Sequence, residues 1–349
     1  MIPPPKLAVA IPTYNRAAIL DDLLWNIGPQ IQRSYPKSVC YIFDNDSNDT
    51  TADIVRKHSE LWPGIIYRKN TTNIGLIRNI ATSVNKSNAE WVWLMGDDDI
   101  PMPWGVKDLL DDIETIESRN DDVVFFFMNG GKVDERKQLC IRHWYSVGKP
   151  DGNLTIYPNG AEIIEHGIHA LAWLSRLAVN RRYWDQERFD QVFCDTDLYT
   201  FVTVLLEVAG RAKSAYTNKL YVMATDRGSR AYYFSKIAVS RVSEFPRIER
   251  MIVELFGMQK AKKLLETERR NWIRTRGSFA LKIGVFEEEY KGQLRYLHEP
   301  ISRFWQERFL LKAIYFVTRV RFIKRALKKL YFKSRTNADE HLYRINDIV

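Results

Sequence analysis

The sequence WVWLMGDDDIPMP, residues 91–103, joins a strand of buried character to a dense cluster of acids. The aromatic and aliphatic run ends at Gly96, and three consecutive aspartates follow it, Asp97, Asp98 and Asp99. One carboxylate is enough to cap a helix, so three adjacent ones indicate a different task. Carboxylates held at the end of a buried strand and open to solvent are well placed to bind a hard divalent cation.

The segments around this stretch alternate between strand-like and helix-like patterns. They predict strands at residues 6–15, 38–45, 64–70, 90–96 and 121–129, and helices at residues 17–31, 49–60, 75–87 and 103–118. Strands that alternate with helices of this length form parallel sheets through right-handed crossovers. The sequence therefore predicts an α/β fold with a mostly parallel, Rossmann-like sheet flanked by helices.

The rest of the chain is less regular. Residues 131–170 are polar and rich in Gly, Pro and Asn, and we expect a loop there. Residues 194–210 are typical of a helix that opens on acids. The C-terminal third is charged and helical in pattern, with few glycines or prolines. We therefore predict two domains, residues 1–230 and a helical C-terminal extension over residues 231–349.

The net charge of +9 is concentrated near the C-terminus. Residues 301–335 contain eleven lysines and arginines and a single acid, Glu307. Four apolar residues recur there at helical spacing, opposite the basic ones: Val320, Ile323, Leu327 and Leu330. The pattern predicts a basic amphipathic helix lying on an anionic membrane surface. The alternative is a helix packed on the first domain with a solvated basic face. A nucleic-acid role is not favoured, because no nucleic-acid-binding motif accompanies the charge.

Composition excludes several classes of protein. Apolar residues at 45% and charged residues at 27% are globular values, which excludes disordered and fibrous chains. The three cysteines, Cys40, Cys140 and Cys194, are too far apart for a disulfide scaffold or a thiolate zinc site. No secretory signal and no run of about 18 apolar residues is visible. We expect a cytoplasmic protein.

Four polar segments follow the predicted strands. They are PTYNR (residues 12–16), DNDSND (residues 44–49), NTTNIG (residues 70–75) and GDDD (residues 96–99). Open parallel sheets bind ligands outside the carboxyl ends of their strands. We therefore expect these four segments to meet at one edge of the sheet and to form the binding site.

The motifs AIPTYNR, FDNDSNDTT, NIGLIRN and GDDDIPMP, in this order, resemble the nucleotide-binding half of a family 2 glycosyltransferase with the GT-A fold. The resemblance covers residues 6–130 well and residues 165–230 weakly. It is strongest to bacterial enzymes that build surface polysaccharide or its lipid-linked precursor. The resemblance implies a hexosyltransferase-type enzyme that moves a sugar, with inversion, from a nucleotide-diphosphate donor to an acceptor hydroxyl.

The resemblance implies that Mg²⁺ or Mn²⁺ is held by residues among Asp97, Asp98 and Asp99. A departing diphosphate needs its charge neutralised, and such a cation does this when carboxylates hold it. When the metal motif of the family is aligned on the proline-rich turn, the resemblance implies that Asp98 faces the metal and that Asp97 lies near the ribose. Asp99 would then support both residues. The Asp-x-Asp pattern of the family is also met by Asp97 with Asp99, so the register stays open.

The resemblance also implies a set of nucleotide-binding residues. They are Pro12, Thr13, Tyr14, Arg16, Asp44, Asn45, Asp46, Asn73, Gly75, Arg78 and Asp97. Local alternatives remain: an Asx-turn with helix capping after the second strand, a core-facing Tyr14, and a solvated Arg78. One departure from the family stands out, because Asn45 occupies a position that is commonly Asp. An amide tolerates a base without an N3–H, such as cytosine, so we hypothesise that the donor base is not uracil.

Inverting transfer needs a carboxylate that takes the proton from the acceptor hydroxyl. The resemblance places this base at the start of the helix over residues 194–210, with Asp195 the first candidate and Asp197 the second. The usual Glu-Asp pair is here Cys194-Asp195, and the alternative is a helix N-cap. Arg227 and Arg230 flank a glycine and are candidates for closing over the phosphates.

The expected partners are a nucleotide-diphosphate sugar and a glycan or lipid-linked glycan acceptor. A peripheral place on the inner face of the cell membrane would bring the site beside such an acceptor. Two other functions remain open. A sugar nucleotidyltransferase should carry a Gly-rich loop after its first strand, which PTYNR is not. A non-catalytic nucleotide- or glycan-binding protein would bind nucleotide without metal-dependent turnover.

Overall fold

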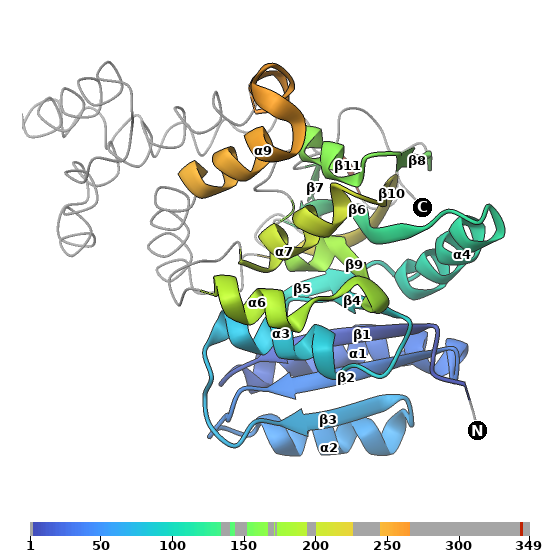
Figure 1. The fold of residues 1–349 in the computed structure, drawn as a ribbon. Coiled ribbons are helices and arrows are strands. Elements are labelled where there is room, and N and C mark those ends of the chain that lie inside the picture. Colours follow the sequence, from blue (N-terminus) through green and yellow to red (C-terminus); the bar gives the residue numbers. More distant parts are fainter. Residues whose placement is uncertain are drawn as a thin grey trace, which may run out of the picture. The chain divides into compact units, whose positions relative to one another are not determined.

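The computed structural model describes residues 3–133, 140–143, 152–166, 171, 173–193, 200–225, 245–265 and 343–344 (Figure 1). The chain divides into two compact units, Met1–Gly228 with Tyr343–Val349, and Ser229–Leu342. Helix α9 (Phe245–Leu264) represents the second unit in the described part of the chain. The basic segment 301–335 lies outside the described residues. No helix in the described ranges is long and apolar enough to cross a membrane.

The first half of the chain alternates strands and helices as predicted. The elements are β1 (Leu7–Thr13), α1 (Ala17–Ser34), β2 (Ser38–Asp44), α2 (Thr51–Leu61), β3 (Ile65–Lys69), α3 (Leu76–Lys86), β4 (Trp91–Leu94) and α4 (Gly105–Ser118). Strands β3, β2, β1 and β4 lie side by side in that order, and all three pairings are parallel. The predicted α/β fold with a mostly parallel sheet is confirmed.

The alternation of side chains along β1 separates the two faces of this sheet. Leu7, Val9 and Ile11 join one buried cluster with apolar residues of α1 and α4. Helix α1 contacts α2 and α4, whereas α3 contacts α6 (Gln186–Val192) and α7 (Thr200–Ala209). Helices therefore cover both faces of the parallel strands, as Figure 1 shows around β1 and β4.

Strands from later in the chain extend the sheet beyond β4. Strand β9 (Leu177–Asn180) lies antiparallel between β4 and β6 (Val123–Val133). Strand β10 (Lys213–Ala224) runs parallel to β6 and antiparallel to β5 (Asp99–Pro101) and β8 (Leu154–Tyr157). Short 3₁₀ turns complete this region: η2 (Gly160–His166), η3 (Leu174–Arg176) and η4 (Arg181–Tyr183).

The expectation of a loop over residues 131–170 is wrong. Strand β6 continues to Val133, and β7 (Cys140–His143), β8 and η2 follow within that range. Strand β7 pairs with β6 and with β11 (Tyr343–Arg344). Strand β8 pairs with β10 and leaves its side chains half-buried or exposed. It has only four residues, LTIY, inside a polar segment, and so short a run is not enough for a strand to be recognised from sequence.

Candidate functional site

The carboxyl ends of β4, β1, β2 and β3 meet at one edge of the sheet. Backbone hydrogen bonds continue past the strands, from the N–H of Asn45 to the carbonyl of Thr13 at 2.9 Å and from the N–H of Met95 to the carbonyl of Ala10 at 2.9 Å. These bonds fix the polar segments that follow β2 and β4 beside the end of β1. The structure therefore brings together the four polar segments singled out in the sequence.

Asp97 is buried, and both of its carboxylate oxygens accept hydrogen bonds. Its Oδ2 accepts a hydrogen bond from the Thr13 hydroxyl at 2.8 Å, and its Oδ1 accepts one from Arg16 Nη1 at 2.7 Å. Burial raises the pKa of Asp97 to about 6, although Arg16 and Thr13 both oppose this rise. Asp97 therefore ties the end of β1 to the acidic turn.

Asp98 is the most accessible of the three acids, with 19% of its side chain exposed. Its Oδ2 accepts a hydrogen bond from Arg16 Nη1 at 3.2 Å, and its backbone carbonyl accepts one from the Thr225 hydroxyl at 2.6 Å. Burial lowers the pKa of Arg16, but the charges of Asp97 and Asp98 outweigh burial and raise it overall. The Arg16 guanidinium thus supplies positive charge between two carboxylates.

Asp99 is held by the segment that precedes β9. Its Oδ2 accepts hydrogen bonds from the Trp173 indole N–H at 2.6 Å and from the Ser175 hydroxyl at 2.5 Å. The Ser175 oxygen in turn accepts from the backbone N–H of Gly96 at 2.8 Å. Burial, followed by the charge of Asp98, raises the pKa of Asp99 to about 7. Asp99 therefore joins the acidic turn to Trp173.

Trp173 reaches this position because Gly130 leaves room for its ring. A Cβ on Gly130 would lie 2.7 Å from the Trp173 ring, closer than any real contact. The ring packs against the main buried cluster while its N–H reaches Asp99.

We expect Asp99→Ala to destabilise the protein strongly, because it leaves the Trp173 and Ser175 donors without their buried acceptor. Each lost partner costs about 1–3 kcal/mol, so we expect Tm to fall by roughly 5–10 °C. Asp99→Asn keeps an acceptor oxygen and should lower Tm by less than half as much. Differential scanning calorimetry measures both, and equal losses in the two variants would contradict this role.

The residues after β2 hold the backbone in shape. Asp44 is fully buried, its Oδ1 accepts from the backbone N–H of Ser47 at 2.8 Å, and its Oδ2 accepts from the Tyr67 hydroxyl. Asp46 adopts a left-handed conformation with φ 68° and lies 3.6 Å from Lys69 Nζ. The Asx-turn considered in the sequence is present at Asp49, whose Oδ1 accepts from the backbone N–H of Thr51, two residues on, at 3.0 Å.

The turn after β1 leaves Tyr14 at the surface. Asn15 has φ 51°, its backbone N–H donates to the Ser47 hydroxyl at 2.9 Å, and its Oδ1 accepts from the N–H of Asn48 at 2.9 Å. The Tyr14 side chain is 43% exposed, so it does not face the core. An exposed aromatic ring at this edge is available for stacking on a ligand.

Arg78 packs against the segment around α6. Its guanidinium lies 4.1 Å over the Phe193 ring, and Nη1 lies 4.0 Å from Asp190 Oδ1. The Arg78 side chain is thus half-exposed while it packs on Phe193, and its contact with a diphosphate stays a prediction. Four sequence candidates lie outside the described residues: Asp195, Asp197, Arg227 and Arg230.

Arg176 is a buried charged residue that the sequence did not reveal. Its Nε donates to the Met128 carbonyl at 2.7 Å, and its guanidinium lies 4.2 Å over the Phe127 ring. It directly precedes β9 and follows the Trp173–Ser175 segment that holds Asp99. In sequence it is one basic residue inside an apolar run, a pattern equally typical of a surface strand.

The donor chemistry of the acidic turn fits a hard divalent cation. Asp97 and Asp99 both have raised pKa values, caused by burial and by the charge of Asp98 between them. A bound cation would offset both causes, because its positive charge stabilises the ionised carboxylates. Asp98 has the exposure needed to reach such an ion, and Asp97 shares Arg16 with it. The described residues contain no group of three or more acidic, histidine or cysteine side chains arranged as a metal cage. Ligand oxygens would therefore have to complete the coordination.

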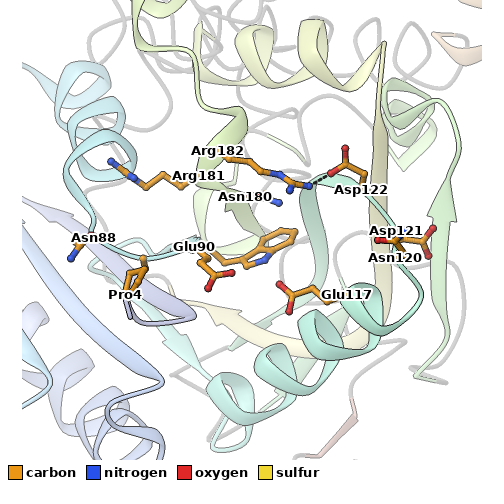
Figure 2. A pocket seen from close by; sticks show the side chains of 12 residues that line it. Pro4, Asn88, Glu90, Glu117, Asn120, Asp121, Asp122, Asn180, Arg181 and Arg182 are labelled. Carbon is orange, nitrogen blue, oxygen red and sulfur yellow. Dashed lines mark ion pairs between the residues drawn. The ribbon is translucent and has the colours of Figure 1, made fainter. Parts of the chain in front are cut away.

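A cavity of about 710 Å³ lies at the opposite edge of the sheet (Figure 2). It is lined by residues from the amino ends of β4 and β6 and from the end of β9. Its acidic groups are already paired: Asp122 with Arg182, Glu90 and Glu117 with Lys6, and Asp121 with Lys213. Because these charges already have partners, the carboxyl edge is the stronger candidate for binding an ionic ligand.

Comparison with known proteins identifies related chains. Residues 8–180 match the model of Glycosyl transferase family 2. Abequosyltransferase RfbV of Salmonella typhimurium (strain LT2) is 28% identical over 218 residues, covering 58% of this chain and 60% of the relative. The match thus spans less than two thirds of that relative's length.

Two solved structures resemble this chain at low identity. S. aureus TarS in complex with UDP-GlcNAc has a TM-score of 0.50 and 17% identity, covering 94% of this chain and 92% of that chain. The mannosyltransferase PcManGT from Pyrobaculum calidifontis, in complex with GDP-Man and Mn²⁺, has a TM-score of 0.47 and 15% identity, covering 92% and 88%. The likeness to TarS shows a shared fold.

Proposed function

Because this chain belongs to glycosyl transferase family 2, we propose that it transfers a sugar from a nucleotide-diphosphate donor to an acceptor hydroxyl. The observation that carries the proposal is the acidic turn Asp97–Asp99 beside Thr13, with Asn45 farther along the same carboxyl edge. Adjacent strands lie about 4.8 Å apart, so the acids after β4 and Asn45 after β2 are roughly 10 Å apart. A nucleoside diphosphate can span that distance from its phosphates to its base.

Asp98, with help from Asp97, would hold Mg²⁺ or Mn²⁺ against the donor. When bound, such a cation neutralises the charge of the leaving diphosphate. Arg16 is placed to hold Asp97 in position through its 2.7 Å contact while Asp98 turns to the ligand. Asp99 keeps the turn in shape through Trp173 and Ser175.

The nucleotide would lie across the end of β1. Thr13 borders the acidic turn through its hydrogen bond to Asp97, and the exposed Tyr14 offers a ring for the ribose or base. Pro12, Asp44, Asp46, Asn73 and Gly75 shape this edge, with Asp44 acting through the backbone of Ser47. Arg78, Arg227 and Arg230 are proposed phosphate contacts.

The acceptor side is proposed from sequence position. Asp195, or Asp197 after it, would take the proton from the acceptor hydroxyl as its oxygen displaces the nucleoside diphosphate, and this single displacement inverts the anomeric carbon. The abequosyltransferase relative favours an acceptor in bacterial surface glycan synthesis. The basic segment 301–335 would bring the enzyme to a lipid-linked acceptor at the inner membrane surface.

A donor screen tests this function. Purified protein is incubated with UDP-, GDP-, CDP- and dTDP-linked sugars and Mn²⁺, and release of nucleoside diphosphate is followed by a coupled assay. We expect release from one donor class, with activity lost in EDTA and restored by Mn²⁺. In a parallel incubation with nucleoside triphosphates and a sugar 1-phosphate, release of pyrophosphate would instead indicate a nucleotidyltransferase. Nucleotide binding without any turnover, even with membrane extract as acceptor source, would favour a non-catalytic binding protein.

A further inference from the structure

A network of asparagine side chains closes the ends of β2 and β3 against the start of α3. Asn45 Oδ1 accepts a hydrogen bond from Asn70 Nδ2 at 3.1 Å and another from the backbone N–H of Ile74 at 3.0 Å. Asn45 Nδ2 donates to Asn73 Oδ1 at 2.8 Å. The side chain of Asn45 is thus held from three directions, and the residue is 4% exposed.

Backbone groups fix which end of the Asn45 amide faces which partner. The N–H of Ile74 can only donate, so the atom of Asn45 that faces it must be oxygen. The N–H of Gly75 donates to Asn73 Oδ1 at 2.9 Å, so Asn73 presents an acceptor to Asn45. Both constraints place the Asn45 nitrogen toward Asn73 and remove the usual ambiguity between amide oxygen and nitrogen.

The third partner is fixed in the same way. The Phe43 carbonyl can only accept, and it takes a hydrogen bond from Asn79 Nδ2 at 2.9 Å. Asn79 therefore turns its oxygen to Asn70, whose Nδ2 donates to it at 3.0 Å. The same Asn70 nitrogen donates to Asn45 Oδ1, so Asn45 must present oxygen there as well.

This arrangement leaves Asn45 with one hydrogen-bonding group for a ligand. An amide oxygen has two lone pairs, and both are taken by Asn70 and Ile74. The amide nitrogen carries two hydrogens, one of which goes to Asn73. The second has no acceptor among the described residues, and a buried donor without an acceptor is costly. Asn45 therefore offers a donor and no acceptor.

We propose that Asn45 selects a nucleotide base with an acceptor ring nitrogen, cytosine or adenine, over uracil, thymine and guanine. The inference rests on the proposed function, which places the base end of the donor at Asn45, two strands from the acidic turn. Cytosine N3 and adenine N1 accept a hydrogen bond. Uracil and thymine present N3–H, and guanine presents N1–H, at the same ring position. Seated with that position against Asn45, each would put two N–H groups face to face and would have to shift until a neighbouring carbonyl oxygen met the amide.

The loop after β3 is built for an amide at position 45. In the Asn45→Asp variant, a carboxylate oxygen would stand 2.8 Å from Asn73 Oδ1, where two acceptors repel each other. The loop has to rearrange around such a carboxylate, and the fixed donor is lost. The base preference is therefore a property of the network and not of Asn45 alone.

Isothermal titration calorimetry with CDP, ADP, UDP, dTDP and GDP, each with Mn²⁺, tests the proposal on the unaltered protein. We expect CDP or ADP to bind at least tenfold more tightly than UDP, dTDP and GDP, a difference of about 1.4 kcal/mol. The CDP and ADP arms decide between a pyrimidine and a purine. Equal or tighter binding of UDP, dTDP or GDP would overturn the inference and leave the transferase function standing. Failure of all five to bind would overturn both.

Analogues and variants identify the atom responsible. Replacing the ring nitrogen by C–H, in 3-deaza-CDP or 1-deaza-ADP, should weaken binding at least tenfold; unchanged affinity would refute the role of that nitrogen. Asn45→Asp should abolish the preference for the acceptor base, whereas Asn26→Asp, on the surface of α1, should keep it. A retained preference in Asn45→Asp would contradict the proposal. The analogue arm remains decisive if that variant does not fold.

Discussion

Asp98→Asn should reduce turnover about a thousandfold, equivalent to about 4 kcal/mol of transition-state stabilisation. The amide keeps the shape of the side chain but removes the charge that a divalent cation needs. Asp98 is the acid with 19% of its side chain exposed, and among the described residues its side chain pairs with Arg16 at 3.2 Å. Cation-dependent nucleotide binding should fall with turnover, because both depend on that charge.

The fold of the Asp98→Asn variant should be intact. Asp97 keeps its contacts to Thr13 and Arg16, and Asp99 keeps Trp173 and Ser175, so Tm should change by no more than about 2 °C. Asp111→Asn is a matched control, since Asp111 is an exposed helical acid paired with Lys107. Turnover in Asp98→Asn within tenfold of the control would exclude Asp98 from the cation site.

Asp195→Asn should reduce turnover by about 10²–10⁴-fold, the usual effect of removing a general base. The asparagine cannot take the proton from the acceptor hydroxyl, while the proposed donor and cation sites at the ends of β1, β2 and β4 are unchanged. Calorimetry should therefore give the same Kd for nucleotide with Mn²⁺ as the unaltered protein. A variant that loses binding together with turnover would point to a structural role instead.

Asp197→Asn provides the matched comparison for Asp195→Asn. If Asp195 is the base, Asp197→Asn should keep turnover within about tenfold of the unaltered protein. The reverse ranking would assign the base to Asp197, and near-normal turnover in both variants would remove this segment from the chemistry. The pH profile of kcat adds a second readout, because loss of the base removes the acidic limb.

The first half of the fold could be predicted because its pattern is local. Leu20, Leu23, Leu24 and Ile27 lie on one face of α1 and are all buried. The later strands were missed for physical reasons. Strand β10 carries Thr217, Asn218 and Lys219 at its centre, where its pairing with β6 shifts register. That polar interruption conceals a strand of 12 residues.

The candidate site was predictable in place but not in detail. Strand ends identified the edge, because parallel strands put their carboxyl ends together. The partners of Asp99, Trp173 and Ser175, are 74 and 76 residues away in sequence, and no local pattern reports such contacts. The orientation of the Asn45 amide depends likewise on backbone groups of a separate loop. The residue type shows which hydrogen bonds a side chain is able to make. The neighbours of that side chain in the fold decide which of its donor and acceptor atoms are available to a ligand.

An anomalous diffraction measurement at the manganese absorption edge tests the central claim most directly. Crystals are grown with Mn²⁺ and the nucleoside diphosphate that binds most tightly. We expect one anomalous peak about 2.0–2.2 Å from an Asp98 carboxylate oxygen and in contact with the diphosphate, with the base beside Asn45. Nucleotide bound at the opposite edge of the sheet, or at this edge with no peak beside Asp98, would contradict the account.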